Sequence, residues 1–294
     1  MKTLTAKVSM GLGAAGVTGA AATGAWYMSQ SNDVKSQLIS DGLTLVGESP
    51  RAWRAVFLAH KEDGDFISFA GISESMNDRE AGSKVMSACK KVTSEDSGSK
   101  DYDISLSKAK KYCTTPELKT VEAKVLFSDH EISSEERDFR DIFILHKGDN
   151  SFVEKVKAVD SSTSSFDSNV GIDTAYSLVQ KFCDSLKAKE SSPSNVADYE
   201  KYCLQTPSNI QGFYESKGLT LVGDWAGKFE SIKASDTNLV NDIKGSSSNL
   251  NQSSPSSEVG SKLEEWCKKE VVKTINSADP NSGENSKVKT RCFN

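Results

Sequence analysis

The sequence is poor in the residues that build most catalytic and metal sites. Among its 294 residues there are only three histidines, and His60, His130 and His146 lie at least 16 positions apart. No two cysteines have the C-x2-C spacing that close pairs of zinc ligands show. The chain also lacks the G-x-S-x-G, H-E-x-x-H and P-loop patterns of common hydrolases, metalloproteases and nucleotide-binding proteins. We therefore expect no catalytic residue, no metal ligand and no cofactor.

An excess of basic charge is also missing. The chain has 36 Lys and Arg against 41 Asp and Glu, for a net charge of -5. Nucleic-acid-binding domains usually carry clustered positive charge, so we expect no nucleic-acid partner. Leu, Ile, Val and Phe together make up about a fifth of the chain, close to the level of roughly 20% at which disorder becomes common. We expect a folded protein with a thin core.

One uncharged segment stands out near the N-terminus. Residues 8–28 carry no charge and are preceded by Lys2 and Lys7. A helix of this length spans a hydrocarbon layer of about 30 Å, and the lysines favour a cytoplasmic N-terminus. The sequence therefore predicts that residues 1–30 form a single-pass membrane anchor with the body of the protein outside the cell. The alternative is a cleaved secretory signal with alanines 20–22 at the cleavage site, which would give a secreted protein.

The six cysteines are regularly spaced. They form three neighbouring pairs with separations of 24, 20 and 25 residues, and the second members are 90 and 89 residues apart. A constant period of this length indicates repeated small domains. In an exported chain, a disulfide that closes a loop of this size contributes about 3 kcal/mol. The disulfide candidates are Cys89 with Cys113, Cys183 with Cys203, and Cys267 with Cys292.

Three short matches support the same period. Each one pairs a stretch of one predicted repeat with a stretch of another. They are Gly-Leu-Thr-Leu-Val-Gly at 42–47 and 218–223, Lys-Tyr-Cys at 111–113 and 201–203, and an aromatic stretch ending in His-Lys at 53–61 and 139–147. The last repeat keeps only Phe229 at the equivalent distance from its glycine. We therefore predict three modules, which are residues 31–116, 117–207 and 208–294.

Each module is predicted to be mainly helical. Ser49 and Pro50 form a typical N-cap and first-turn pair, and Trp53, Phe57 and His60 follow at helical spacing. A second helix carries the first cysteine of each pair, and a third helix ends near the second cysteine. The predicted fold class is therefore mainly α, with an N-terminal transmembrane helix followed by three small repeated helical modules.

Some stretches allow other local structures. Residues 43–46 and 66–69 alternate enough to be short strands. The serine-rich stretches 161–168 and 246–257 have too few apolar residues to order themselves. We expect the serine-rich stretches to be surface loops or disordered insertions.

A nucleotide-binding pattern occurs within the N-terminal span. Gly11, Gly13 and Gly16 spell G-x-G-x-x-G. A dinucleotide-binding fold would need a second buried strand leading to an acidic residue, whereas residues 29–35 are polar. Small residues in a membrane span are the preferred interpretation.

Several polar residues on the predicted aromatic helices have ordinary structural explanations. His60 and His146 occupy equivalent helix ends, where a histidine commonly interacts with the C-terminal carbonyl groups. Glu135, Glu136 and Asp138 are expected to be solvated charges of a first helical turn. We therefore assign no ligand role to these residues.

The general layout suggests a family. A Met-Lys start, a Gly/Ala-rich N-terminal span, a polar Ser/Lys/Asn-rich body and Lys-Tyr-Cys repeats make the chain resemble the uncharacterised paralogous families of surface and membrane proteins in haemotropic mycoplasmas. The resemblance implies a role at the surface of a wall-less bacterium that lives on red blood cells, such as adhesion or antigenic variation. A host protein or cell surface would then be the partner. The resemblance supplies no catalytic residues.

The sequence thus predicts a membrane-anchored, externally displayed repeat protein without catalytic activity. The alternative is a cytosolic enzyme. Such an enzyme would either bind a nucleotide through residues 11–16 or use a cysteine as a hydrolytic nucleophile.

Overall fold

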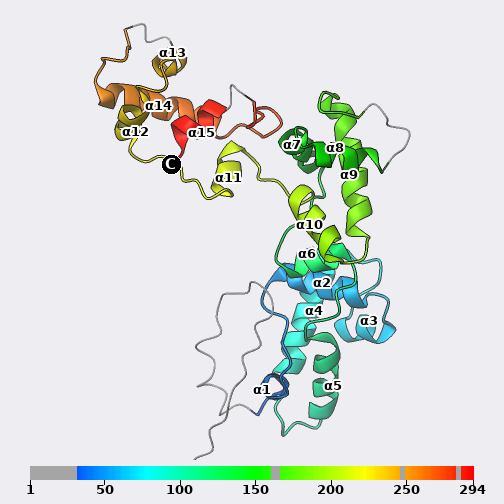
Figure 1. Ribbon diagram of the computed structural model, residues 1–294. Coiled ribbons are helices and arrows are strands. Elements are labelled where there is room, and N and C mark those ends of the chain that lie inside the picture. Colours follow the sequence, from blue (N-terminus) through cyan, green and yellow to red (C-terminus); the bar gives the residue numbers. More distant parts are fainter. Residues whose placement is uncertain (1–31, 160–165, 246–248, 283–285) are drawn as a thin grey trace, which may run out of the picture. The chain divides into compact units, whose positions relative to one another are not determined.

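The computed structural model describes residues 32–159, 166–245, 249–282 and 286–294. These residues are mainly helical, as predicted, and their β-structure is confined to five isolated bridges (Figure 1). No helix in these ranges is both long enough and apolar enough to span a bilayer. The predicted membrane segment, residues 8–28, lies outside the described part of the chain.

The described residues belong to two compact units. The first contains the chain up to Val46 together with Ser87–Thr115, and the second contains Gly47–Met86 and Pro116–Asn294. One helix, α4 (Asp78–Thr93), contributes residues to both units. Every other helix belongs to a single unit.

The first unit contains one disulfide. The buried side chains of α1 (Val34–Ser40) pack against α5 (Tyr102–Tyr112). Cys113 directly follows α5 and is bonded to Cys89 of α4, with 5.5 Å between the Cα atoms. A backbone bridge between Leu45 and Thr114 lies next to this disulfide. The disulfide therefore joins the end of α5 to the C-terminal half of α4.

The second unit contains the remaining helices. The N-terminus of α2 is as predicted, because the Ser49 hydroxyl accepts a hydrogen bond from the Ala52 N–H and Pro50 is the first helical residue. The helices are α2 (Pro50–His60), α3 (Gly64–Ala70), α6 (Val121–Phe127), α7 (Glu136–His146), α8 (Asn150–Lys157), α9 (Ile172–Lys187), α10 (Pro193–Tyr202), α11 (Ile210–Glu215), α12 (Trp225–Ile232), α13 (Leu239–Ile243), α14 (Ser256–Glu270) and α15 (Ser286–Cys292).

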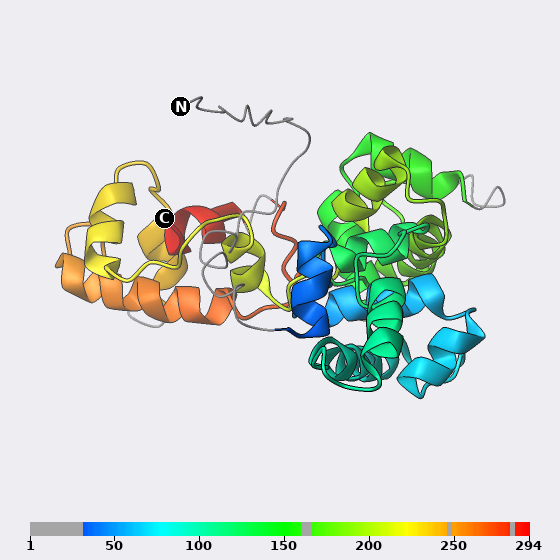
Figure 2. The same cartoon turned by 90° about the horizontal axis from the view of Figure 1, so that it is seen from below.

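One hydrophobic core runs through this unit. It extends from Ala55 in α2 to Phe293 at the end of the chain. The closest helix pairs are α2 with α6, α7 with α9, and α12 with α14. Figure 2 shows α12, α14 and α15 next to one another. Phe139 and Phe143, predicted on one face of a helix, are both buried in this core.

The structure decides the local conformation of three stretches for which the sequence allowed a strand or a loop. Residues 66–69 are not a strand but lie in α3, whose N-terminus is capped by Asp63 and whose C-terminus is followed by Gly71 at φ 63°. Residues 43–46 contribute only the isolated bridge at Leu45. The serine-rich stretch 246–257 was predicted too long, because α14 already begins at Ser256.

A buried arginine joins separate segments of the second unit. Arg54 of α2 lies 2.8 Å from Asp78 at the start of α4, and 2.5 Å from Glu131, which precedes α7. Arg51 also reaches Glu131, at 3.0 Å. Only 7% of the Arg54 side chain is exposed, so removing one of its partners would leave a charge with little access to water, which costs more than breaking a surface pair.

The close approach of α12 to α14 gives a first testable prediction. A Cβ atom at Gly260 would lie 2.8 Å from the backbone nitrogen of Ala226. We expect Gly260→Ala to lower the free energy of unfolding by about 1–2 kcal/mol, because overpacking outweighs the helix propensity gained. The matched control is Gly64→Ala in α3, where a Cβ meets nothing within 4 Å. The control should be neutral or stabilising in urea unfolding, and equal effects of the two substitutions would contradict the packing.

Candidate functional site

Two helices of the second unit end in the same pattern, His-Lys-x-Asp. It occupies residues 60–63 at the end of α2 and residues 146–149 at the end of α7. In both copies the aspartate caps the next helix, because Asp63 and Asp149 each accept a backbone hydrogen bond at 2.9 Å. The sequence match stopped at His-Lys and missed these caps. An aspartate three residues after each histidine was the signal that could have revealed them.

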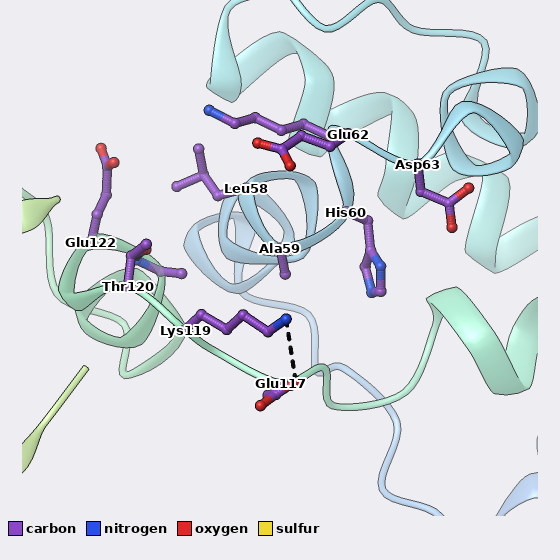
Figure 3. Close-up of a pocket in the computed structure, with 11 residues that line it drawn as sticks. Leu58, Ala59, His60, Glu62, Asp63, Glu117, Lys119, Thr120 and Glu122 are labelled. Carbon is purple, nitrogen blue, oxygen red and sulfur yellow. Dashed lines mark hydrogen bonds and ion pairs between the residues drawn. The ribbon is translucent and has the colours of Figure 1, made fainter. Parts of the chain in front are cut away.

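A hollow of about 520 Å³ lies beside the first copy (Figure 3). We call it the first hollow. One wall is the end of α2 and the turn into α3, and the other is the start of α6 with the segment before it. Lys119 and Glu117 form an ion pair of 3.7 Å within the lining, and burial raises the pKa of Glu122. The charged lining residues are mainly acidic, with Glu62, Asp63, Glu117 and Glu122 against Lys61 and Lys119.

A second hollow of about 220 Å³ lies beside the other copy. Its walls are the end of α7, residues 201–207 and α11. Leu145, His146 and Phe213 supply apolar and aromatic surface. The lining contains two lysines, Lys201 and Lys217, and no aspartate or glutamate. The two hollows therefore differ in the sign of their charge.

The histidines of the pattern pack against aromatic rings. His146 lies 5.5 Å from the Phe152 ring and 5.2 Å from the Tyr202 ring, measured between centroids. His60 packs similarly on Phe66, at 5.2 Å. Burial lowers the pKa of His146 to about 4, so its imidazole is neutral near pH 7. The expected role at the helix C-terminus is therefore replaced by ring packing at His146.

The aspartate of the second copy, Asp149, is held in its ionised form. The Asp149 carboxylate accepts hydrogen bonds from the Lys201 ammonium at 2.9 Å and from the Tyr202 hydroxyl at 3.0 Å. These hydrogen bonds lower the pKa of Asp149 to about 2. Lys201 thus has an anionic partner at the edge of the second hollow.

Two acidic residues of α7 are fully buried, which corrects a prediction. Asp138, expected to be solvated, has no exposed surface, and neither has Asp141. Asp138 pairs with Arg137 at 2.9 Å. Asp141 accepts hydrogen bonds from the Thr206 hydroxyl at 3.2 Å and from the Asn276 N–H at 3.0 Å. A segment 135 positions away in the sequence therefore covers this face of α7.

Asp141 and His146 should make the free energy of unfolding depend on pH in opposite directions. Burial raises the pKa of Asp141 from 3.8 to about 6, so its stabilising contribution is complete below pH 3.8 and is lost as the pH rises through 6. The pKa of His146 falls from 6.5 to about 4, so its contribution is complete above pH 6.5 and is lost as the pH falls through 4. Each effect amounts to at most about 3 kcal/mol.

Single substitutions should separate these opposing effects. Between pH 7 and pH 4.5, Asp141→Asn should lose stability more steeply than the parent protein, because only the histidine effect remains. His146→Phe should lose less stability or gain it. Urea unfolding at both pH values measures the difference, and parallel behaviour of the two variants would contradict the assignment.

The sequence offered six cysteines and one glycine pattern as candidate site residues. All six cysteines lie in the three predicted disulfides, which leaves no thiol for a cysteine nucleophile in this structure. The pattern of Gly11, Gly13 and Gly16 lies outside the described residues. Within the described ranges, no group of three or more His, Cys, Asp or Glu side chains is arranged to hold a metal ion.

The candidate sites are therefore hollows beside the His-Lys-x-Asp pattern. Besides the first and second hollows, a wider one of about 840 Å³ lies beside the second copy and is lined by Lys147, Asp149 and Asp279. The first hollow is larger and mainly acidic, and the second is smaller and basic. No protein-family model, no curated protein and no solved structure matches the chain, so no known site can be transferred to these hollows.

Proposed function

We propose that the protein is a non-catalytic binding protein, displayed outside the cell on a membrane anchor formed by residues 8–28. Its body would consist of three copies of one five-helix module, with borders near residues 116 and 207. The observation that carries the proposal is the set of three disulfides, because each one joins the last two helices of a proposed module.

The order of elements supports the repeat. Each proposed module begins with a short helix and continues with an aromatic helix, another short helix and a long helix that contains the first cysteine. A final helix ends at or next to the second cysteine. These sets are α1 to α5, α6 to α10, and α11 to α15. The first helix of each set is capped by a polar side chain, which is Asp33, Thr120 or Asn209.

Backbone pairing supports the same register. In each proposed module, one residue between the first and second helices bridges the residue that directly follows the second cysteine. The pairs are Leu45 with Thr114, Ile132 with Leu204, and Leu221 with Phe293. Equivalent bridges at equivalent positions are expected if one fold occurs three times.

A close contact between two helices supports the repeat. It also changes which residue of the third module corresponds to Trp53. Gly82 and Gly260 each precede the first cysteine of a pair by seven residues. A Cβ atom at Gly82 would lie 2.9 Å from the backbone nitrogen of Arg54 and 3.1 Å from the carbonyl carbon of Trp53. A Cβ atom at Gly260 would lie 2.8 Å from the backbone nitrogen of Ala226 and 2.9 Å from the carbonyl carbon of Trp225. Trp225 rather than Phe229 is therefore the counterpart of Trp53.

The second module fits this alignment with a different side chain. Tyr176 occupies the position of the glycines, seven residues before Cys183. The Arg140 guanidinium lies over the Tyr176 ring at 4.7 Å, and Arg140 is the counterpart of Arg54. A ring that stacks on the arginine takes the place of close backbone packing.

The disulfides also support an exported body. Disulfides persist in oxidising compartments and are rare in the cytosol of most organisms. The hollows at the proposed module borders would then face an external partner, such as another protein or a cell surface.

Protease treatment of intact cells tests the display. We expect added protease to degrade the body without lysis, while a cytosolic control protein stays intact. A body that is protected until the cells are lysed would contradict the proposed orientation.

A further inference from the structure

We propose that the second hollow binds a small carboxylate with an apolar body, such as an organic acid of about the size of an amino acid. This inference rests on the binding role proposed above and gives that role a ligand class. It concerns the space between α7, residues 201–207 and α11.

The charge of the lining favours an anion. Lys201 is partly neutralised, because its ammonium lies 2.9 Å from Asp149. Lys217 has no ion pair among the described residues, and its ammonium lies 4.6 Å from the centre of the Phe213 ring. The lining holds no carboxylate, and Lys217 is exposed at the rim, where its ammonium can meet a ligand. A ligand carboxylate would supply the missing partner through a charge-assisted hydrogen bond.

The apolar part of the lining limits the rest of the ligand. Ile142 is 1% exposed and Phe213 is 8% exposed, and both line the hollow together with Leu145. A volume of about 220 Å³ is below the usual range for drug-sized ligands, which begins at roughly 300 Å³. A compact aliphatic or aromatic body therefore fits better than a sugar chain or a nucleotide.

The first hollow provides a contrast within the same protein. It lies beside the equivalent His-Lys-x-Asp pattern, but four acidic residues face two lysines there. A carboxylate would meet like charges in that hollow, which disfavours binding. Selectivity for the second hollow thus follows from the lining and not from the shared pattern.

Binding of benzoate to the full-length protein in detergent tests the proposal. We expect benzoate to bind at least tenfold more tightly than benzamide, its neutral analogue, as measured by calorimetry. NMR should show a rise in the pKa of His146 when benzoate is bound, because a negative charge would lie nearby. Acetate should bind more weakly than benzoate, because it lacks the apolar body.

Variants locate the site. Lys217→Ala should weaken benzoate binding at least tenfold, and Lys217→Arg should retain most of it. The matched control is Lys61→Ala in the first hollow, which should leave binding unchanged. Circular dichroism verifies that each variant is folded. Equal affinities for benzoate and benzamide, or equal losses in the Lys217 and Lys61 variants, would overturn the proposal. Such a result would not affect the proposed display of the body, which the protease experiment tests separately.

Discussion

Removal of the last disulfide by Cys267→Ala with Cys292→Ala is expected to lower the free energy of unfolding by about 3 kcal/mol. The bond closes a loop with a sequence separation of 25, and the cost follows from the entropy that the unfolded chain regains. Typical domains have a total stability of about 5–15 kcal/mol. The loss would therefore be a large fraction of the stability of a thinly cored protein.

The effect should reach beyond the disulfide. The loop between α14 and α15 contacts α7 through Asn276 to Asp141, and contacts the residue that follows α7 through Asp279 to Lys147 at 2.9 Å. When α15 is no longer tied to α14, this loop should open more often. Hydrogen exchange of residues 274–282 should then become faster, together with a lower midpoint in urea.

A matched variant makes this comparison specific. Cys183→Ala with Cys203→Ala removes a bond of similar loop size, with a separation of 20. Its global cost should also be about 3 kcal/mol, whereas exchange of residues 274–282 should change much less. An unchanged midpoint in the Cys267 and Cys292 variant would contradict the stabilising role of that disulfide.

Substitution of Arg291 should have a comparably large effect. Its side chain has no exposed surface and binds Asp236 through two nitrogens, at 2.6 and 2.9 Å, and Asp242 at 2.8 Å. The guanidinium also lies 5.2 Å from the Trp266 ring. Arg291→Met should lower the free energy of unfolding by about 3 kcal/mol, because it leaves Asp236 without its cation and Asp242 with Lys287 alone.

Second substitutions can show whether Arg291→Met loses stability through unpaired charge or through lost packing. Removing the orphaned charge as well, by Asp236→Asn, should restore a substantial part of the loss caused by Arg291→Met. Arg291→Lys should be intermediate, since an ammonium cannot reproduce the two-pronged contact with Asp236. Urea unfolding measures all of these variants. If the variant with both Arg291→Met and Asp236→Asn is less stable than Arg291→Met alone, the uncompensated charge of Asp236 is not the cause.

The sequence predicted the elements whose signals are local and long enough to be recognised without the structure. The N-cap Ser49 with Pro50, the helical spacing of Phe139 and Phe143, and the three cysteine pairs all correspond to features of the structure. Each of these signals either lies within a few residues or depends on a spacing that the sequence displays directly.

Shorter helices were missed for a physical reason. α1, α6 and α11 contain only six or seven residues, which is less than two full turns. Over such a length a helical period cannot be told from other patterns. The same limit explains the strand interpretation of residues 66–69, which lie in the seven-residue helix α3. The caps Asp63 and Gly71 were the usable signals there.

The candidate sites could be predicted less well, because distant segments build them. Asp138 and Asp141 are acidic residues on a helix, and solvent exposure is the usual state of such residues. Contacts with Thr206 and with Asn276, both far along the chain, cover this face of α7. The second hollow likewise depends on Phe213 and Lys217, at and just after α11, a helix that the sequence did not reveal.

The most direct test of the account is the thiol state of the protein as it occurs in cells. Intact cells are treated with a thiol-alkylating reagent and lysed in denaturant containing the same reagent, and the protein is digested without reduction and mapped by mass spectrometry. We predict no alkylated cysteine and three cross-linked peptide pairs, which join Cys89 to Cys113, Cys183 to Cys203, and Cys267 to Cys292. Six alkylated cysteines, or a cross-link between different proposed modules, would contradict an exported body of three disulfide-closed modules.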